Sequence, residues 1–171
     1  VCNKNFVSII NTDKELIDDL QNRFSLLNPK VYIKKALTDK RGWNCKESYE
    51  IRFYSVEFRE FLFSQGIEYK TAINKVIPWS ILQCSRENVL NFLKGAFIGD
   101  GSAFIWKDRG NKKIGVAYYS SSKLLVDQMQ ILLKSLGYLS YKNKRHSSIS
   151  KNKQWFIRLN GTYASDFITD I

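Results

Sequence analysis

The sequence lacks several features that would decide its function at once. Its 171 residues include a single histidine, His146, and three cysteines with no CxxC pair. One histidine excludes metal sites built on histidine pairs and makes Ser-His-Asp catalysis a poor hypothesis. Scattered cysteines in odd number indicate reduced thiols rather than a disulfide framework or a zinc site. No run of about 18 apolar residues occurs, so we expect no membrane partner.

The beginning of the chain also lacks the marks of a secreted protein. It has neither a charged leading region nor the long apolar stretch of a signal peptide. Val1 stands where an initiator methionine would, which suggests a fragment or a processed piece. We therefore expect an intracellular protein that is not secreted.

Positive charge is abundant and unevenly distributed. The formal net charge is +11, and the segment 104–160 holds twelve Lys and Arg residues against two acids, Asp108 and Asp127. Such a density favours a polyanionic partner, nucleic acid above all, over a merely solvated basic surface. Hydrophobic residues make up 44% of the chain, enough for a packed core.

An internal repeat organises the chain. Residues 11–24 resemble residues 120–133, with Lys14 matching Lys123 at an offset of 109 residues. Each segment follows a β-rich run and begins with a helix start signal. For the first helix this signal is a capping box of Thr12 and Glu15. Its counterpart is the pair Ser121 and Ser122 ahead of the second helix.

The repeat predicts two lobes of one architecture. Two strands and a short helix follow each repeated helix, and Arg52 matches Arg158 at the end of a strand. We assign residues 1–66 to the first lobe, 67–84 to a linker and 85–171 to the second lobe. The second lobe also has a leading helix and strand, which gives it the order αββαββα. In the first lobe the partner of Asp100 would precede residue 1, so this lobe lacks its leading helix and strand.

The stretch FLKGAFIGDGS, in the leading helix of the second lobe, carries unusual glycines. Gly95 and Gly99 share one helix face with Ala96 beside them, although glycine costs about 1 kcal/mol against alanine inside a helix. Small residues let two helix backbones approach closely. Two such helices, one per lobe, would bring two carboxylates together at their ends. Asp100 would then be half of a site for a hard divalent cation.

This stretch resembles the LAGLIDADG, or dodecapeptide, motif of homing endonucleases, and the residues ahead of it, NKVIPWSILQCSREN, are similar to the approach to that helix. The resemblance covers nearly the whole chain at the scale of two lobes. It implies an α+β fold of two tandem αββαββα lobes with pseudo-two-fold symmetry, whose antiparallel sheets form a DNA-binding saddle. It also implies a site-specific, metal-dependent double-strand endonuclease that serves intron or intein mobility.

The resemblance assigns roles to particular residues. Asp100 and Gly99 would hold Mg²⁺ or Mn²⁺, and Arg52 and Arg158 would lie near the metals and the scissile phosphate. The helix interface would consist of Gly95, Ala96 and Gly99. The partners would be duplex DNA with a long target site and a missing N-terminal segment or second chain that supplies the other acidic helix.

Residues on the strands and hairpin tips are the candidates for DNA contact, because a twisted antiparallel ribbon fits the major groove. We cannot assign the DNA-facing side of each strand from the pattern. The candidates are Lys34, Lys35, Lys40, Arg41, Lys46, Ser102, Trp106, Lys107, Arg109, Lys112, Lys113, Lys142, Lys144, Arg145, Lys151 and Lys153.

Two alternatives remain open beside the endonuclease. The chain could be a catalytically inactive relative that binds DNA or acts as an intron RNA maturase. It could also be a basic protein-interaction domain without a nucleic-acid role. Asp100 favours cleavage, whereas a single acid cannot build a paired metal site.

Overall fold

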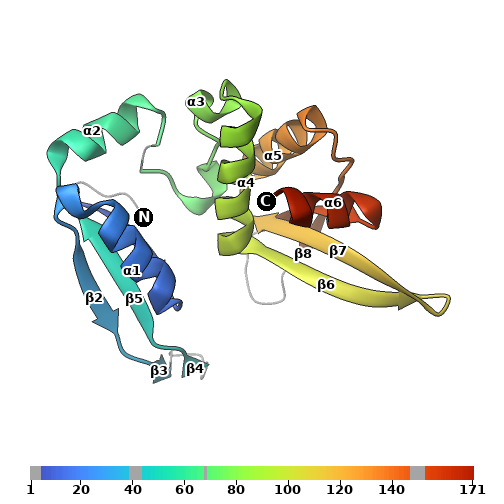
Figure 1. The fold of residues 1–171 in the computed structure, drawn as a ribbon, viewed down its shortest axis with the longest axis horizontal. Coiled ribbons are helices and arrows are strands. Elements are labelled where there is room, and N and C mark those ends of the chain that lie inside the picture. Colours follow the sequence, from blue (N-terminus) through green and yellow to red (C-terminus); the bar gives the residue numbers. More distant parts are fainter. Residues whose placement is uncertain (1–4, 39–43, 68, 147–152) are drawn as a thin grey trace. The chain divides into compact units, whose positions relative to one another are not determined.

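The computed structural model describes residues 5–38, 44–67, 69–146 and 153–171. The chain forms two compact units, Val1–Tyr69 and Lys70–Ile171 (Figure 1). Each combines helices with an antiparallel sheet, so the predicted α+β class is confirmed. None of the helices in the described part of the chain has the length and apolar character needed to span a membrane.

The second unit has the predicted order αββαββα from the helix Arg86–Asp100 onward. Its elements are the short helices η2 (Ala72–Asn74) and α3 (Trp79–Leu82), followed by α4 (Arg86–Asp100), β6 (Gly101–Asp108), β7 (Asn111–Ser120), α5 (Lys123–Ser135), β8 (Tyr141–His146), β9 (Lys153–Asn160) and α6 (Thr162–Asp170). The strands form one antiparallel sheet in the order β6-β7-β9-β8.

The core of the second unit lies between one face of this sheet and the helices α4, α5 and α6 (Figure 1). Val116 and Tyr118 of β7 and Ile157 and Leu159 of β9 contribute the sheet side of this core. These residues alternate along their strands, as expected for a sheet that buries one face. The helices fill the other side, and Phe167 of α6 is fully buried.

The first unit repeats part of this arrangement. Its elements are β1 (Val7–Asn11), α1 (Lys14–Arg23), η1 (Ser25–Leu27), β2 (Lys30–Lys34), β3 (Leu37–Thr38), β4 (Asn44–Cys45), β5 (Ser48–Phe53) and α2 (Val56–Ser64). The main sheet has the order β1-β5-β2, which reproduces β7-β9-β8 of the second unit. Its buried core is small, with Ile17, Ile51 and Phe53 at the centre.

Strand register confirms the sequence match between the two arginines. Arg52 on β5 lies between Ser8 of β1 and Lys30 of β2. Arg158 on β9 lies between Ala117 of β7 and Tyr141 of β8. Both arginines therefore occupy the central strand of equivalent three-stranded sheets.

The repeated helices also match, with one correction at the start of the first. The N-cap of α1 is Asp13, whose carboxylate accepts a hydrogen bond from the backbone N–H of Leu16 at 3.2 Å, and not Thr12 of the predicted capping box. The side chain of Asn11 accepts from the N–H of Asp13 at 2.9 Å, so the turn before the helix extends through Thr12. Aspartate caps helices as well as serine does, and a sequence rule centred on Thr12 missed it.

The second repeated helix starts as predicted. Ser122 is the N-cap of α5, and its hydroxyl accepts from the backbone N–H of Leu125 at 3.1 Å. Lys123 pairs with Asp127 one turn later at 2.7 Å, as Lys14 pairs with Asp18 at 2.5 Å in α1. The duplication thus extends to caps and surface ion pairs.

Residues 70–84, which are most of the segment 67–84 predicted as a linker, belong to the second compact unit. The backbone carbonyl of Lys75 accepts a hydrogen bond from the Ser122 hydroxyl at 2.6 Å. The backbone N–H of Ile77 donates to the side chain of Gln128 at 2.8 Å, and Ile77 is buried. These contacts fix the segment that leads into α4.

Candidate active site and nucleic-acid interface

Asp100 lies where helix α4 passes directly into strand β6. The helix begins at the N-cap Ser85 and ends at Asp100, and Gly101 already has extended backbone geometry. A Cβ atom on Gly101 would lie 2.3 Å from the carbonyl oxygen of Phe97, well inside any tolerable contact. Glycine is therefore required at position 101, and this close approach fixes Asp100 at the junction.

The two faces of α4 differ sharply. Val89, Leu93 and Phe97 are buried in the core of the second unit. Gly95 and Gly99 are exposed, and a Cβ atom on either would meet no described atom within 4 Å. No packing among the described residues demands these two glycines. If the small size of these residues has a role, that role is a contact with a group outside the described core.

Ala96 lies apart from the two glycines in its packing. Its side chain is partly buried and packs against the core of the second unit. The three residues of the predicted helix interface therefore lie in two places. Gly95 and Gly99 form an open strip together with Ile98, whereas Ala96 lies at the edge of the core. Ile98 is 61% exposed and continues the open strip.

Asp100 is exposed, and its carboxylate forms no ion pair with any residue that the structure describes. Within the described ranges, no group of three or more His, Cys, Asp or Glu residues is placed to hold a metal ion. Tyr118, whose backbone pairs with Gly101, is the near neighbour that the sequence did not suggest. Burial, followed by the negative charge of Asp100, raises the pKa of Tyr118 to about 12. Its phenol therefore stays protonated at neutral pH.

The sheet of the second unit has one face that none of its described helices covers, here called the open face. Alternation from the buried residues Val116 and Leu159 assigns its positions. The open face consists of Ser102, Phe104, Trp106, Asp108, Asn111, Lys113, Gly115, Ala117, Tyr119, Tyr141, Asn143, Arg145, Gln154, Phe156, Arg158 and Asn160. In β6, the alternation places Ser102, Phe104, Trp106 and Asp108 on the helix-free face and Ala103, Ile105 and Lys107 on the other face.

The predicted DNA contacts divide between the two faces. Ser102, Trp106, Lys113 and Arg145 belong to the open face. The helix-covered face or its continuation holds Lys107, Lys112, Lys142 and Lys144. Lys142 there forms an ion pair with Asp127 of α5, which ties it to the helix layer.

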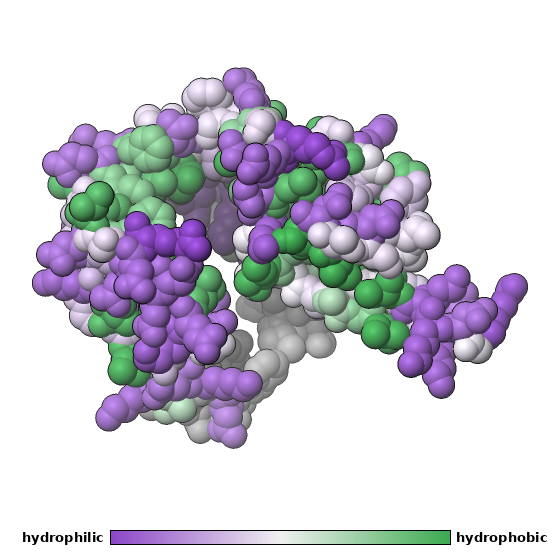
Figure 2. Space-filling model, viewed as in Figure 1, coloured by the Kyte–Doolittle hydropathy of each residue, from purple (hydrophilic) through white to green (hydrophobic). Residues whose placement is uncertain are grey.

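Several other candidates lie at hairpin ends or outside the described residues. Arg109 forms the turn between β6 and β7 with a positive φ of 49°. Figure 2 shows hydrophilic residues gathered at the tip of this hairpin. Lys35 and Lys46 are exposed in the first unit. Lys40, Arg41 and Lys151 lie outside the described residues, and the side chain of Lys153 is not described either.

Arg158 is held on the open face by aromatic rings rather than by an acid. Its guanidinium carbon lies 4.8 Å from the centre of the Phe104 ring and 5.8 Å from that of Phe156. Among the described residues it forms no ion pair, and its buried Nε has no hydrogen-bond partner. Arg145 stacks similarly on Tyr119 at 4.9 Å.

The equivalent arginine of the first unit has a different environment. Arg52 pairs with Glu50 at 2.8 Å, and its guanidinium lies 4.5 Å from the ring centre of Phe6 and 4.4 Å from that of Tyr32. Lys34, a predicted DNA contact, also pairs with Glu50 at 3.0 Å. Glu50 thus neutralises part of the positive charge that the sequence assigns to this surface.

Glu50 is a residue that sequence analysis missed. Only 4% of it is exposed, and the hydrogen bond from Arg52 is the main cause that lowers its pKa from 4.5 to about 2. The sequence did contain a signal for this ion pair. Glu50 lies two positions before Arg52 on the same strand, so both side chains lie on the same strand face. The position that matches Glu50 in the second unit is Phe156, so the two units are not chemically equivalent.

Comparison with known proteins identifies the family. Residues 87–171, from the first turn of α4 to the C-terminus, match the family described as LAGLIDADG-like domain. The chain belongs to the LAGLIDADG family. A solved structure of the homing endonuclease I-WcaI bound to its DNA recognition sequence shares the fold of this LAGLIDADG chain, with a TM-score of 0.63. The similarity covers 99% of this chain and 71% of that one at 15% sequence identity.

Two relatives of this LAGLIDADG chain come from Methanocaldococcus jannaschii. The DNA-directed RNA polymerase subunit Rpo1C is 29% identical over 177 residues, which cover 98% of this chain and 17% of that protein. The uncharacterized protein MJ1054 is 27% identical over 150 residues, which cover 87% of this chain and 15% of that protein. The chain therefore spans less than a fifth of the length of these curated relatives.

Proposed function

We propose that this LAGLIDADG chain forms part of a site-specific endonuclease that cleaves double-stranded DNA with a divalent metal ion at Asp100. The observation that carries the proposal is the position of Asp100. Its exposed carboxylate stands at a fixed helix-to-strand junction, beside a strip of open glycines and at the edge of a basic, helix-free sheet face.

The residues at this junction fit a Mg²⁺ or Mn²⁺ ion. Mg²⁺ is bound in many phosphoryl-transfer enzymes by one or two carboxylates together with substrate phosphates. Asp100 offers one carboxylate, and the carbonyl of Gly99 lies in the last turn of α4, where the helix dipole favours cations. When bound, such an ion would activate water and stabilise the leaving oxygen of the scissile phosphate.

A second acidic helix would complete the site. The strip of Gly95, Ile98 and Gly99 is open enough for a helix to approach its backbone. We propose that this helix comes from a segment preceding the first unit or from a second copy of the chain. Each source would add one carboxylate beside Asp100.

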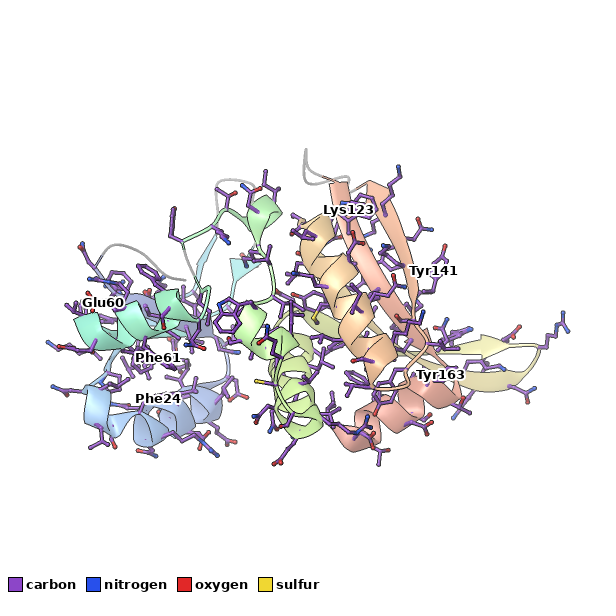
Figure 3. The ribbon with its side chains drawn as sticks, turned by 90° about the horizontal axis from the view of Figure 1, so that it is seen from above. Phe24, Glu60, Phe61, Lys123, Tyr141 and Tyr163 are labelled. Atoms are coloured by element: carbon purple, nitrogen blue, oxygen red, sulfur yellow. The ribbon has the colours of Figure 1, made fainter. Side chains whose placement is uncertain are left out.

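The first unit supports the same idea through an uncovered phenylalanine. Phe167 of α6 is fully buried and packs on Phe97 of α4 with ring centres 4.8 Å apart. Its counterpart in α2, found by aligning Arg52 with Arg158, is Phe61, which is 58% exposed (Figure 3). A helix equivalent to α4 would cover Phe61 as α4 covers Phe167.

The open faces would receive the DNA, with a long target read by both units. Arg158, which no described acid neutralises, is the better candidate to contact the scissile phosphate. Arg52, held by Glu50, would position a strand instead of stabilising developing charge. The mobility of an intron or intein is the biological setting that we propose, since the chain corresponds to a short part of its longer relatives.

Cleavage of a randomised duplex library in Mg²⁺ tests this proposal. The chain is assayed alone and with a copy of residues 85–109 placed ahead of Val1, which restores a motif helix at the repeat offset. We expect Mg²⁺-dependent double-strand cuts at one long sequence, strongest in the extended chain. Selective, salt-sensitive binding without cuts in either form would reject the nuclease.

A DNA-binding protein that does not cleave is the second candidate. The isolation of the Asp100 carboxylate among the described residues favours it. The same library assay separates the two functions, because this candidate enriches a sequence without cutting it.

A further inference from the structure

Two aromatic rings of β6, those of Phe104 and Trp106, lie close to Gly115 of the neighbouring strand β7 on the open face. A Cβ atom on Gly115 would lie 2.7 Å from atoms of the Phe104 ring and 2.9 Å from the Trp106 ring. Both rings therefore rest directly on the backbone of β7, where only a glycine leaves room. Their centres are 5.6 Å apart and their planes are inclined by 31°, so they form a nearly continuous surface.

This surface is part of a larger aromatic layer. Tyr119, Tyr141 and Phe156 occupy the same face, with ring centres 5.9 Å apart for Tyr119 and Phe156 and 6.4 Å for Tyr141 and Phe156. Tyr141, at the beginning of β8, is 56% exposed (Figure 3). Aromatic residues usually fill cores, so their placement on a helix-free face calls for a ligand with apolar planar groups.

Two cations lie beside these rings on the open face. Lys113 lies directly opposite Trp106 across the β6–β7 ladder. Arg158 covers the ring of Phe104, whereas among the described residues no cation stacks on Trp106. Trp106 is partly exposed, so part of this residue is open to a ligand.

We propose that the Phe104–Trp106 surface is a stacking site for an unpaired base of single-stranded nucleic acid, with Lys113 and Arg158 contacting the adjoining phosphates. Single-strand binding proteins combine aromatic platforms with cationic grooves in this way. A four-stranded antiparallel sheet with stacking aromatics on its open face is also a common arrangement for reading unpaired RNA bases. In a duplex the base faces are already stacked and do not reach a flat ring.

The site goes beyond cleavage of duplex DNA, and binding measurements with the full chain test it. Fluorescence anisotropy is measured with labelled oligo-dT and oligo-U of about 12 nucleotides, within the usual range for one such platform. A duplex of the same length serves as the third ligand. The two single strands share unpaired bases, and their comparison shows whether DNA or RNA is preferred.

Three variants isolate the ring. Trp106→Leu removes the stacking face, Trp106→Tyr keeps it, and Trp79→Leu makes the same change at a tryptophan of α3 that is 55% exposed. We expect Trp106→Leu to weaken single-strand binding about tenfold, the loss typical of one stacked base. Trp106→Tyr and Trp79→Leu should each stay within about twofold of the parent, which is below the loss of one stacking contact.

The outcomes decide between the occupants of this surface. A preference of the parent for either single strand, lost in Trp106→Leu and kept in Trp106→Tyr, supports the stacking site. Equal losses for single strand and duplex would assign Trp106 to the duplex interface and overturn it. Absence of single-strand binding in the parent overturns it as well. If Trp106→Leu fails to fold, the test rests on the parent and Trp106→Tyr. Both must then bind single strands with similar affinity, and a large loss in Trp106→Tyr would overturn the proposal.

Discussion

Replacement of Glu50 by glutamine tests the ion pair that distinguishes the first unit. Glu50 is nearly buried and accepts from Arg52 at 2.8 Å and from Lys34 at 3.0 Å. Its pKa falls from 4.5 to about 2, with the Arg52 hydrogen bond as the first cause. A shift of this size corresponds to about 3 kcal/mol of free energy of unfolding at most.

Solvent reduces this value, because 48% of the Lys34 side chain and 27% of the Arg52 side chain are exposed. We therefore expect Glu50→Gln to lower the free energy of unfolding at pH 7 by about 1–3 kcal/mol. Each kcal/mol should lower the Tm of a unit of this size by about 4–8 °C. The pKa of Glu50 is lower in the folded chain than in the unfolded chain, so its charge stabilises the fold fully above pH 4.5. This stabilisation is lost as the pH falls toward 2. The destabilisation should thus disappear near pH 2.

Urea unfolding followed by circular dichroism, with hydrogen exchange of the β5 amides, measures the effect in the first unit. Glu60→Gln on the exposed side of α2 is the control, and it should behave as the parent. Equal stability of Glu50→Gln and the parent at pH 7 would contradict a stabilising role of this ion pair. An unchanged difference at pH 2 would also contradict it, because Glu50 is about half protonated at its pKa and has lost most of this stabilisation.

Three further comparisons follow from duplicated or neighbouring residues. Gly101→Ala should destabilise the second unit, because the added Cβ atom would clash with the carbonyl oxygen of Phe97. Gly99→Ala should stabilise the same unit by about 1 kcal/mol, because position 99 has room for the Cβ atom and alanine favours a helix. Urea midpoints that shift in the same direction in both variants would contradict this. Phe167→Ala should cost about 3–5 kcal/mol and Phe61→Ala less than about 1 kcal/mol, and similar calorimetric losses would show that burial does not separate the two sites. Arg158→Gln should reduce the salt dependence of duplex binding by about one phosphate contact, and an unchanged slope in a salt titration would remove Arg158 from the phosphate contacts.

Much of the fold could be predicted because the chain contains the same pattern twice. Alternation in the strands, the repeated helix with its Lys–Asp pair and the serine cap of α5 are local signals, and each was present in the sequence. The cap of α1 was assigned one residue early, because Thr12 and Asp13 are both good caps and only the Asn11 turn decides between them.

The site could be predicted only in part, since its surroundings depend on contacts between distant strands. The position of Asp100 at a helix end follows from local sequence, but the need for Gly101 depends on its approach to the Phe97 carbonyl. The neutralisation of Arg52 by Glu50 and the isolation of Arg158 depend on strand register and on neighbouring rings. A side-chain pattern alone cannot distinguish two arginines at matching positions.

Replacement of Asp100 by asparagine tests most directly whether the metal site lies at the end of α4. The chain and its extended form are incubated with the duplex library in Mg²⁺, and Asp108→Asn at the exposed end of β6 serves as a matched control. We expect cuts for the parent and Asp108→Asn, and binding without cuts for Asp100→Asn. Undiminished cutting by Asp100→Asn would contradict the assignment of the metal site to this helix end.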